Sequence, residues 1–306
     1  MPRILITGGS GLLALNWACC MRDSCEVLLA QHTRSVALRN TRSVPLCLES
    51  TESLARSLEQ LQPELVVHAA GLTSVDLCEL QPELAQRLNV ALAVNVARAT
   101  RRLGISLAHI STDHLFSGTR ALYTESDPPL PLNVYARTKL LAEQSVTREN
   151  PAAMIVRTNF FGWGHRYRQS LSDWILASLR NDCKVSMFED VFFTPILADR
   201  LASSVHELIS HHCAGIYHVG GDERLSKYEF AIRLAHVFEL PDSLVQRARI
   251  SALNSKVVRP RDMSLDNSRA RTDMGSSLGG VDEFLRQLKE QERLGRAHEL
   301  FAAVLE

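Results

Sequence analysis

The 306-residue sequence predicts an α/β protein built on a doubly wound parallel sheet. Three observations carry this prediction. Apolar, strand-like stretches alternate with segments of helical periodicity through the first half of the chain. A glycine-rich turn lies between the first strand-like stretch and the first helical one. The stretch Leu65-Val66-Val67 is continuously apolar, as expected for a sheet that helices cover on both faces.

The elements follow from hydrophobic periodicity. In the first half we expect strands at 3–7, 26–30, 65–69, 105–111 and 153–157, with a possible further strand at 44–48. The intervening helices are expected at 12–21, in a segment ending at Leu61, at 79–103 and at 133–148. After about residue 160 the alternation loosens, and we expect helices at 170–179, 197–209, 228–238 and 281–294 and strands at 185–188 and 215–219. The looser pattern of this half predicts a smaller, mixed α/β lobe.

Composition excludes several classes of function. Lys plus Arg and Asp plus Glu both number 34, so a formal net charge of zero predicts no general attraction to nucleic acid or to an anionic membrane. No apolar run is long enough to span a bilayer, and no signal peptide is recognisable, so we expect a cytoplasmic protein. The seven cysteines include no Cys-x-x-Cys pair, which favours reduced thiols and no metal site. His211-His212-Cys213 is more simply explained as a helix end.

The glycine-rich turn indicates a dinucleotide site. Gly8 permits a tight turn, and Gly11 allows the backbone to approach a pyrophosphate at a helix N-terminus, where N–H groups and the helix dipole favour anions. Ala14 is small enough for close packing of helix on strand. Ser10 and Leu12 complete the expected cofactor contacts of this turn. The alternative is a tight turn without a ligand.

The end of the second strand bears on the choice of cofactor. An acidic residue there would bond the ribose hydroxyls of NAD, but the sequence has none. Arg34 and His32 can instead meet a ribose phosphate, so the sequence favours NADP(H) over NAD(H), unless Arg34 is only a surface arginine. A further strand closes on small residues, which suits backbone lying against a cofactor or close strand-helix packing. These residues are Ala69, Ala70 and Gly71.

Three side chains form a candidate catalytic group. Tyr135 and Lys139 are one helical turn apart, so their side chains point the same way. A phenol has a pKa of roughly 10, and a neighbouring ammonium favours the phenolate, so we expect Lys139 to bring the pKa of Tyr135 closer to neutral. Thr112 follows an expected strand and should face the crevice at the carboxyl edge of the sheet. The alternatives are a solvated helix face and an N-cap or turn threonine.

Several motifs occur in an order that resembles the extended short-chain dehydrogenase/reductase superfamily and, in detail, its dTDP-4-dehydrorhamnose reductase family. The resemblance covers nearly the whole chain. Its segments are Thr7-Gly8-x-x-Gly11-x-x-Ala14, Val67-His68-Ala69-Ala70-Gly71 with Thr73 and Val75-Asp76, Ile110-Ser111-Thr112-Asp113-His114, Pro131-Leu132-Asn133-Val134-Tyr135, Arg157-Thr158-Asn159, Gly215-Ile216-Tyr217-His218, Arg259-Pro260 and Leu265-Asp266.

The resemblance implies a Rossmann-like fold and NADPH-dependent reduction of the 4-keto group of a nucleotide-linked 6-deoxy sugar. By this resemblance residues 1–160, completed by parts of 190–225, form the NAD(P)-binding domain, and 161–306 mainly the substrate-binding lobe. Tyr135 would protonate the developing alkoxide, Lys139 would hold the nicotinamide ribose, and Thr112 would bond the carbonyl oxygen. The implied substrate residues are Thr73, Thr112, Asn159 and, beside the diphosphate, Arg259, unless this arginine is structural. The family also suggests a homodimer.

The chain departs from the family around the substrate. His114 stands where a tyrosine is usual, Phe160-Phe161 replaces a pair containing tryptophan, and the stretch 163–168 is unfamiliar. One alternative is a nucleotide-sugar epimerase or dehydratase of the same superfamily. His114 in place of a glutamate opposes a dehydratase, and the missing acidic ribose ligand opposes an epimerase. Another alternative is a non-catalytic regulatory subunit similar to that of methionine adenosyltransferase, since catalytic residues can persist on a fold used for binding.

Overall fold

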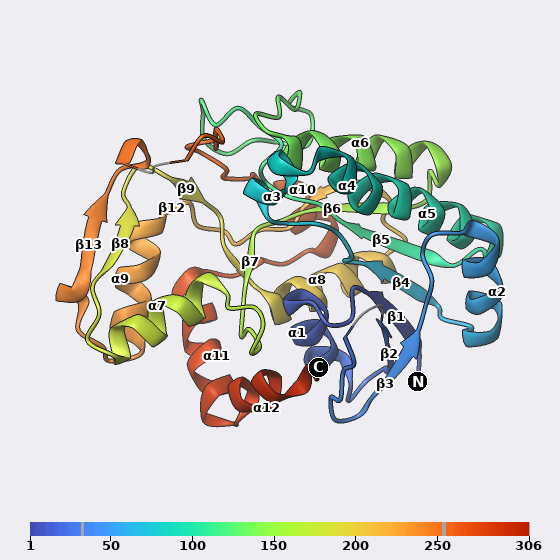
Figure 1. The fold of residues 1–306 in the computed structure, drawn as a ribbon, viewed down its shortest axis with the longest axis horizontal. Coiled ribbons are helices and arrows are strands. Elements are labelled where there is room, and N and C mark those ends of the chain that lie inside the picture. Colours follow the sequence, from blue (N-terminus) through green and yellow to red (C-terminus); the bar gives the residue numbers. More distant parts are fainter. Residues whose placement is uncertain (32–33, 253–254, 306) are drawn as a thin grey trace.

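The computed structural model describes residues 1–31, 34–252 and 255–305 and has a seven-stranded sheet at its centre (Figure 1). Every pairing in this sheet is parallel. The strand order is β11-β6-β5-β4-β1-β2-β3, so the chain starts in the middle and winds outward in both directions. The strands are β1 (Arg3–Thr7), β2 (Glu26–Gln31), β3 (Thr41–Pro45), β4 (Leu65–His68), β5 (Ser106–Ile110), β6 (Met154–Arg157) and β11 (Gly215–His218). The predicted fold class is confirmed.

Helices cover both faces of the sheet, and the side chains of each strand alternate between them. One face carries α2 (Thr51–Leu61), α5 (Leu92–Leu103) and α6 (Val134–Glu149), and the opposite face carries α1 (Leu12–Met21) and α8 (Ala198–Ser210) (Figure 1). Leu5 and Leu28 pack into one hydrophobic cluster with the helices of the first face, whereas Ile4, Ile6 and Leu29 pack into the other cluster. Burial on both faces explains why the strands are apolar without interruption.

The second half adds a lobe at the left of Figure 1, made of helices and two-stranded sheets. Its buried side chains, among them Phe230 and Phe284, belong to the same cluster as Ile4 and Ile6, so one continuous core joins the two halves. The division at residue 160 stays a prediction. The remaining strands of the second half are β7 (Phe160–Phe161), β8 (Val185–Phe188), β9 (Phe192–Phe193), β10 (Ile196–Leu197), β12 (Leu225–Ser226) and β13 (Val245–Ala248), and its remaining helices are α7 (Leu171–Arg180), α9 (Lys227–Val237), α10 (Ser268–Met274), α11 (Val281–Arg293) and α12 (Arg296–Ala303), with 3₁₀ turns η2 (Asp242–Leu244) and η3 (Ile250–Ala252).

One expected helix is broken into several pieces. The sequence predicts a single helix over 79–103, but the structure has α3 (Val75–Leu80), α4 (Pro82–Gln86), a π-helical turn (Arg87–Ala91) and then α5. Pro82 begins α4 because proline lacks the N–H that a helix interior needs. The π-helical turn presents Asn89, whose side chain bonds both the N–H and the C=O of Leu72 and the Thr138 hydroxyl at 2.7–3.1 Å.

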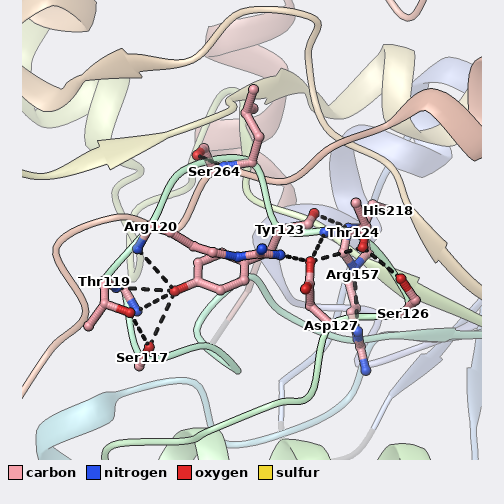
Figure 2. Close-up of polar contacts among 12 residues, drawn as sticks. Ser117, Thr119, Arg120, Tyr123, Thr124, Ser126, Asp127, Arg157, His218 and Ser264 are labelled. Carbon is pink, nitrogen blue, oxygen red and sulfur yellow. Dashed lines mark hydrogen bonds and ion pairs between the residues drawn. The ribbon is translucent and has the colours of Figure 1, made fainter.

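A long loop between β5 and α6 is held by a cluster of polar contacts around the buried Tyr123 (Figure 2). The phenolic oxygen of Tyr123 accepts the backbone N–H groups of Gly118 and Thr119, both at 3.1 Å, and its ring stacks on Phe116 with centroids 4.2 Å apart. The Tyr123 carbonyl bonds His218 at 2.9 Å, which ties the loop to β11. The loop begins with Thr112, so this cluster fixes the segment that carries the candidate site.

Candidate active site

The first turn has the form that the glycine pattern predicts. Gly8 has φ +70°, and a Cβ atom there would lie 2.9 Å from the Cα of Ala70. Only glycine therefore fits without displacing the neighbouring strand end. The N–H of Gly11 donates to the Gly8 carbonyl at 2.7 Å, which closes the turn before α1. The turn after β1 and the one after β4 thus meet backbone to backbone.

Thr7 joins these two turns, a role that sequence reasoning missed. Its hydroxyl oxygen accepts the N–H groups of Ala69 and Ala70, both at 3.2 Å, and bonds Nδ1 of His68 at 2.8 Å. A residue that sits at the last position of a buried strand gives no periodic signal of such a contact, because its partners lie more than 60 positions away in the chain.

The two turns line a cavity of about 420 Å³, within the roughly 300–1,000 Å³ that is typical of small-molecule sites. Its lining includes all the residues predicted from these turns, namely Gly8, Ser10, Gly11, Leu12, Ala69, Ala70 and Gly71. Thr73, predicted as a substrate residue, lines the same cavity. The opposite wall consists of Phe160 and of residues 168–171, so Phe160 and Arg168, which the sequence placed around the substrate, line the cavity of the cofactor turn. His32 lies outside the described residues. Arg34 is exposed, and its guanidinium lies 4.6 Å from the centre of the Tyr167 ring.

The candidate catalytic residues Tyr135 and Thr112 lie together. Asn133 caps α6 by accepting the N–H of Ala136 at 2.9 Å, so Tyr135 stands in the first turn of the helix. Its side chain is buried, and burial raises the pKa of Tyr135 to about 12, against a lowering contribution from its hydrogen bond with Thr112. The His114 and Tyr135 rings pack edge to face, with ring centres 5.7 Å apart. His114 was noted only as a departure from the family.

The expectation that Lys139 brings the pKa of Tyr135 toward neutral is wrong for the chain alone. The Lys139 ammonium donates to the carbonyl of Ile110 at 2.7 Å. Burial lowers the pKa of Lys139 to about 8, and the Glu143 charge opposes this. Desolvation therefore outweighs the Glu143 charge at Lys139 and the Thr112 hydrogen bond at Tyr135. The phenol stays protonated at neutral pH, as a proton donor requires.

Two histidines lie behind Lys139. His68 and His109 stand on adjacent strands with their rings stacked, 5.3 Å between centres. Burial, together with the Lys139 charge, lowers the pKa of His68 to about 3 and that of His109 well below its usual value, so both rings are neutral. Within the described ranges, Nε2 of His68 and both ring nitrogens of His109 have no hydrogen-bond partner. Unpaired polar atoms at such density are unusual in a folded core.

The substrate side of the site surrounds the buried carboxylate of Asp113. Asn159, a predicted substrate residue, donates to Asp113 Oδ2 at 2.5 Å, and the Thr112 hydroxyl donates to Oδ1 at 3.2 Å. Thr112 must therefore change its partner to bond a substrate carbonyl. Lys227, at the start of α9, was missed by sequence reasoning. Its ammonium lies 3.3 Å from the centre of the Phe193 ring, and burial lowers its pKa to about 8, a shift that the Asp113 charge opposes.

Arg259, predicted beside the diphosphate, is held by an acidic side chain. Its Nη2 donates to both carboxylate oxygens of Asp76, at 2.7 and 2.8 Å, and its Nη1 donates to the Ser255 hydroxyl at 2.8 Å. A single guanidinium nitrogen thus contacts both oxygens of the carboxylate, and Arg259 would exchange Asp76 for a phosphate to bind a nucleotide. Its approach to a nucleotide stays a prediction.

The structure also bears on membrane and metal sites. Over the described ranges, the structure has no helix that is both long and apolar enough to cross a membrane. Over the same ranges, no three His, Cys, Asp or Glu side chains group in a way that could hold a metal ion.

Comparisons with known proteins agree with this architecture. A family model described as "RmlD substrate binding domain" matches residues 2–292. The chain is 27% identical to the probable low-salt glycan biosynthesis reductase Agl14 of Haloferax volcanii, over 93% of this chain and 96% of that protein. It is 29% identical to methionine adenosyltransferase 2 subunit beta of Mus musculus, over 88% and 82% of the two chains.

A solved structure shows the same fold. The dTDP-4-dehydrorhamnose reductase of Bacillus anthracis, crystallised in complex with NADP, superposes with a TM-score of 0.84 at 23% identity and covers 95% of this chain and all of that one (100%). The expected resemblance to the extended short-chain dehydrogenase/reductases and their dTDP-4-dehydrorhamnose reductases is thus confirmed. The chain belongs to the RmlD substrate binding domain family.

Proposed function

We propose that this protein is an NADPH-dependent reductase of a nucleotide-linked 4-keto-6-deoxy sugar. The observation that carries the proposal is that two features share one edge of the sheet. A glycine cradle adjoins a cavity at the carboxyl edge of the sheet, and Tyr135, Thr112 and Lys139 stand at the same edge. The family and its named reductases support an oxidoreductase acting on a nucleotide sugar.

The residues present fit a dinucleotide. Gly8 leaves backbone exposed where a side chain would collide with Ala70, and the first turn of α1 faces the cavity. Gly8, Ser10, Gly11 and Leu12 would hold the pyrophosphate, with Ala69 to Gly71 along the other side. Arg34 supports NADP(H) over NAD(H), because a guanidinium suits a ribose phosphate. When bound, the reduced cofactor supplies the hydride.

The side chains supply the proton and the charge. Tyr135 is protonated across the neutral range and would give its proton to the alkoxide that forms at the substrate carbonyl, because an alkoxide is a stronger base than a phenolate. Lys139 would leave the Ile110 carbonyl for the ribose hydroxyls and bring positive charge toward the phenol. Thr112 would turn from Asp113 to the carbonyl oxygen. Asn159, Thr73 and Arg259 would contact the sugar and the diphosphate, and Lys227 adds a further cation on that side.

The experiment is NADPH oxidation by the purified protein with dTDP-4-keto-6-deoxy sugars, run beside the corresponding UDP and GDP sugars. Turnover with any of these supports the reductase, and the nucleotide preference names the substrate. No turnover with any of them contradicts it.

A second function has one observation in its favour, the similarity to the methionine adenosyltransferase subunit over most of both chains. Under this alternative the chain binds a methionine adenosyltransferase catalytic subunit and does not turn over keto-sugars. Stable co-purification with such a subunit, together with no NADPH oxidation, would favour it. A chain that turns over a nucleotide sugar and captures no such subunit would exclude it.

A further inference from the structure

The unfamiliar stretch after β7 forms a strap, residues 163–170, that closes one side of the cofactor cavity. In Figure 1 this yellow-green segment runs down beside α1 before α7 begins. The side chain of Asn16 in α1 donates to the Trp163 carbonyl at 2.7 Å, and the Gly164 N–H donates to Asp173 of α7 at 2.6 Å. His165 and Arg168 pair backbone to backbone through two hydrogen bonds of 2.9 Å. At the other end the Ser170 N–H donates to the same Asp173 carboxylate at 2.9 Å, so the strap is a fixed turn anchored at both ends.

The first contact of the strap is made by Tyr167. Its ring lies against the guanidinium of Arg34, 4.6 Å from the ring centre. A guanidinium that lies on an aromatic face keeps its N–H donors at its edge, free to point at an anion. Arg34 donates no hydrogen bond to any residue that the structure describes. Tyr167 thus orients the arginine without using up its donors.

The second contact is made by Arg168. Its Nη2 donates to the Thr73 hydroxyl at 2.6 Å, across the cavity mouth from the strap to the loop after β4. Arg168 also lines the cavity together with Gly8 and Gly11. A neutral hydroxyl is a weak partner for a guanidinium, and a phosphate oxygen in the same cavity would be a stronger one.

His165 lies between these two cations. It is buried, and burial followed by the charges of Arg168 and Arg34 lowers its pKa. Its Nδ1 accepts the Tyr167 N–H at 3.3 Å. A neutral His165 therefore holds the turn that aims Tyr167 to one side and Arg168 to the other, and adds no third positive charge.

We infer that the strap is a two-part recognition element for a 2′-phosphorylated dinucleotide: Tyr167 holds Arg34 edge-on to the ribose 2′-phosphate, and Arg168 exchanges the Thr73 hydroxyl for the pyrophosphate. This inference rests on the proposed cofactor. The two parts differ in what they distinguish. The Arg34-Tyr167 pair acts only on NADP(H), which carries the extra phosphate, whereas Arg168 acts on NADP(H) and NAD(H) alike.

The test is calorimetric titration of the full-length protein with NADPH and with NADH, which needs no sugar substrate. Tyr167→Leu is expected to weaken NADPH binding about threefold to tenfold and to leave NADH binding unchanged. Tyr167→Phe keeps the ring and should bind as the wild type does. Arg168→Gln is expected to weaken both cofactors about tenfold or more. Arg166→Gln is the matched control, because Arg166 lies on the same strap with its guanidinium 5.7 Å from the Phe301 ring of α12.

The possible results separate the strap from the wider proposal. An equal loss for NADPH and NADH in Tyr167→Leu overturns the 2′-phosphate role of the pair. Wild-type affinity in Arg168→Gln overturns the pyrophosphate role. In either case a wild-type protein that still binds NADPH leaves the proposed reductase standing. Binding of neither cofactor by the wild type overturns the strap inference and the cofactor proposal together.

Discussion

Tyr123 and Tyr135 are both buried tyrosines, and they differ in what surrounds the phenolic oxygen. Tyr123 accepts three backbone N–H groups, at 3.1 to 3.4 Å, and bonds the Ser117 hydroxyl (Figure 2). Burial acts to raise the pKa of Tyr123, but these hydrogen bonds outweigh burial and lower it. Around Tyr135 burial wins, and its pKa rises to about 12. The two phenols therefore differ in pKa because of their hydrogen bonds, and not because of burial alone.

The contrast extends to the neighbours of each tyrosine. Around Tyr123 the buried polar groups have partners: Arg157, for example, holds Glu143 in a buried ion pair and bonds His218. On the side of Tyr135, at the carboxyl ends of β4, β5 and β6, the described side chains leave buried polar atoms unpaired, on His68, His109, Ser111, His114 and Thr158. Paired clusters hold a fold in place, and unpaired ones mark where a ligand is expected.

The largest expected effect comes from the unpaired cluster. Tyr135→Phe removes the phenolic proton and should lower kcat/KM for a nucleotide keto-sugar by about 10²- to 10⁴-fold. Tyr123→Phe is the matched variant and should retain most of the activity of the folded protein. Full activity in Tyr135→Phe would refute the proton-donor role. Steady-state NADPH oxidation makes both measurements.

Breaking the ion pair of the paired cluster should act on stability instead. Arg157 and Glu143 are both almost fully buried and 2.7 Å apart. Arg157→Met leaves the Glu143 carboxylate buried without its counter-charge, which should lower the free energy of unfolding by about 3–5 kcal/mol. Removing both charges in Arg157→Met/Glu143→Leu should recover most of this loss. Urea denaturation of the wild type, the single variant and the double variant measures these changes in stability. An unchanged midpoint in the single variant would show that the pair contributes little.

A smaller loss of stability is expected for the Tyr123 hydroxyl. Tyr123→Phe leaves three loop N–H groups without their acceptor and should lower the free energy of unfolding by about 1–3 kcal/mol. Water can reach Thr119 and Arg120, which keeps the loss at this level. Tyr135→Phe removes a buried hydroxyl with few partners and should cost little. Equal losses in the two variants would contradict the comparison.

The smallest effect concerns alkaline pH. Unfolded tyrosine loses its proton near pH 10, whereas Tyr135 keeps its proton until about pH 12. Between these values the folded state binds more protons, so the Tyr135 contribution to stability is lost as pH rises, by about 1.4 kcal/mol per pH unit. Between pH 9 and 11 the free energy of unfolding of Tyr135→Phe should therefore fall by about 1 kcal/mol less than that of the wild type, as measured by urea denaturation. Parallel losses would show that the phenol titrates normally.

Sequence reasoning worked where the physical requirement is local. Gly8 and Gly11 were predicted because a tight turn after a strand needs them, and the alternation of strands and helices gave the sheet. The sequence placed parts of 190–225 with the first domain without saying which parts, and β11 within that range pairs with β6.

The remainder depends on contacts between distant parts of the chain. Arg168 meets Thr73 across 95 positions, and Lys227 approaches Asp113 from another lobe, so no spacing rule reveals either one. The pKa of Tyr135 was misjudged because burial decides it, and burial belongs to the folded protein. The π-helical turn that presents Asn89 also lies inside a segment whose periodicity reads as one helix.

The central claim is that one crevice holds NADPH and a nucleotide together beside Tyr135. Calorimetric titration with NADPH and with NADH, each in the presence and absence of dTDP, tests it most directly. We expect NADPH to bind more tightly than NADH, and dTDP to strengthen the binding of NADPH. Binding of neither cofactor, with or without dTDP, would contradict the account and favour a protein that has kept the fold of a reductase without its chemistry.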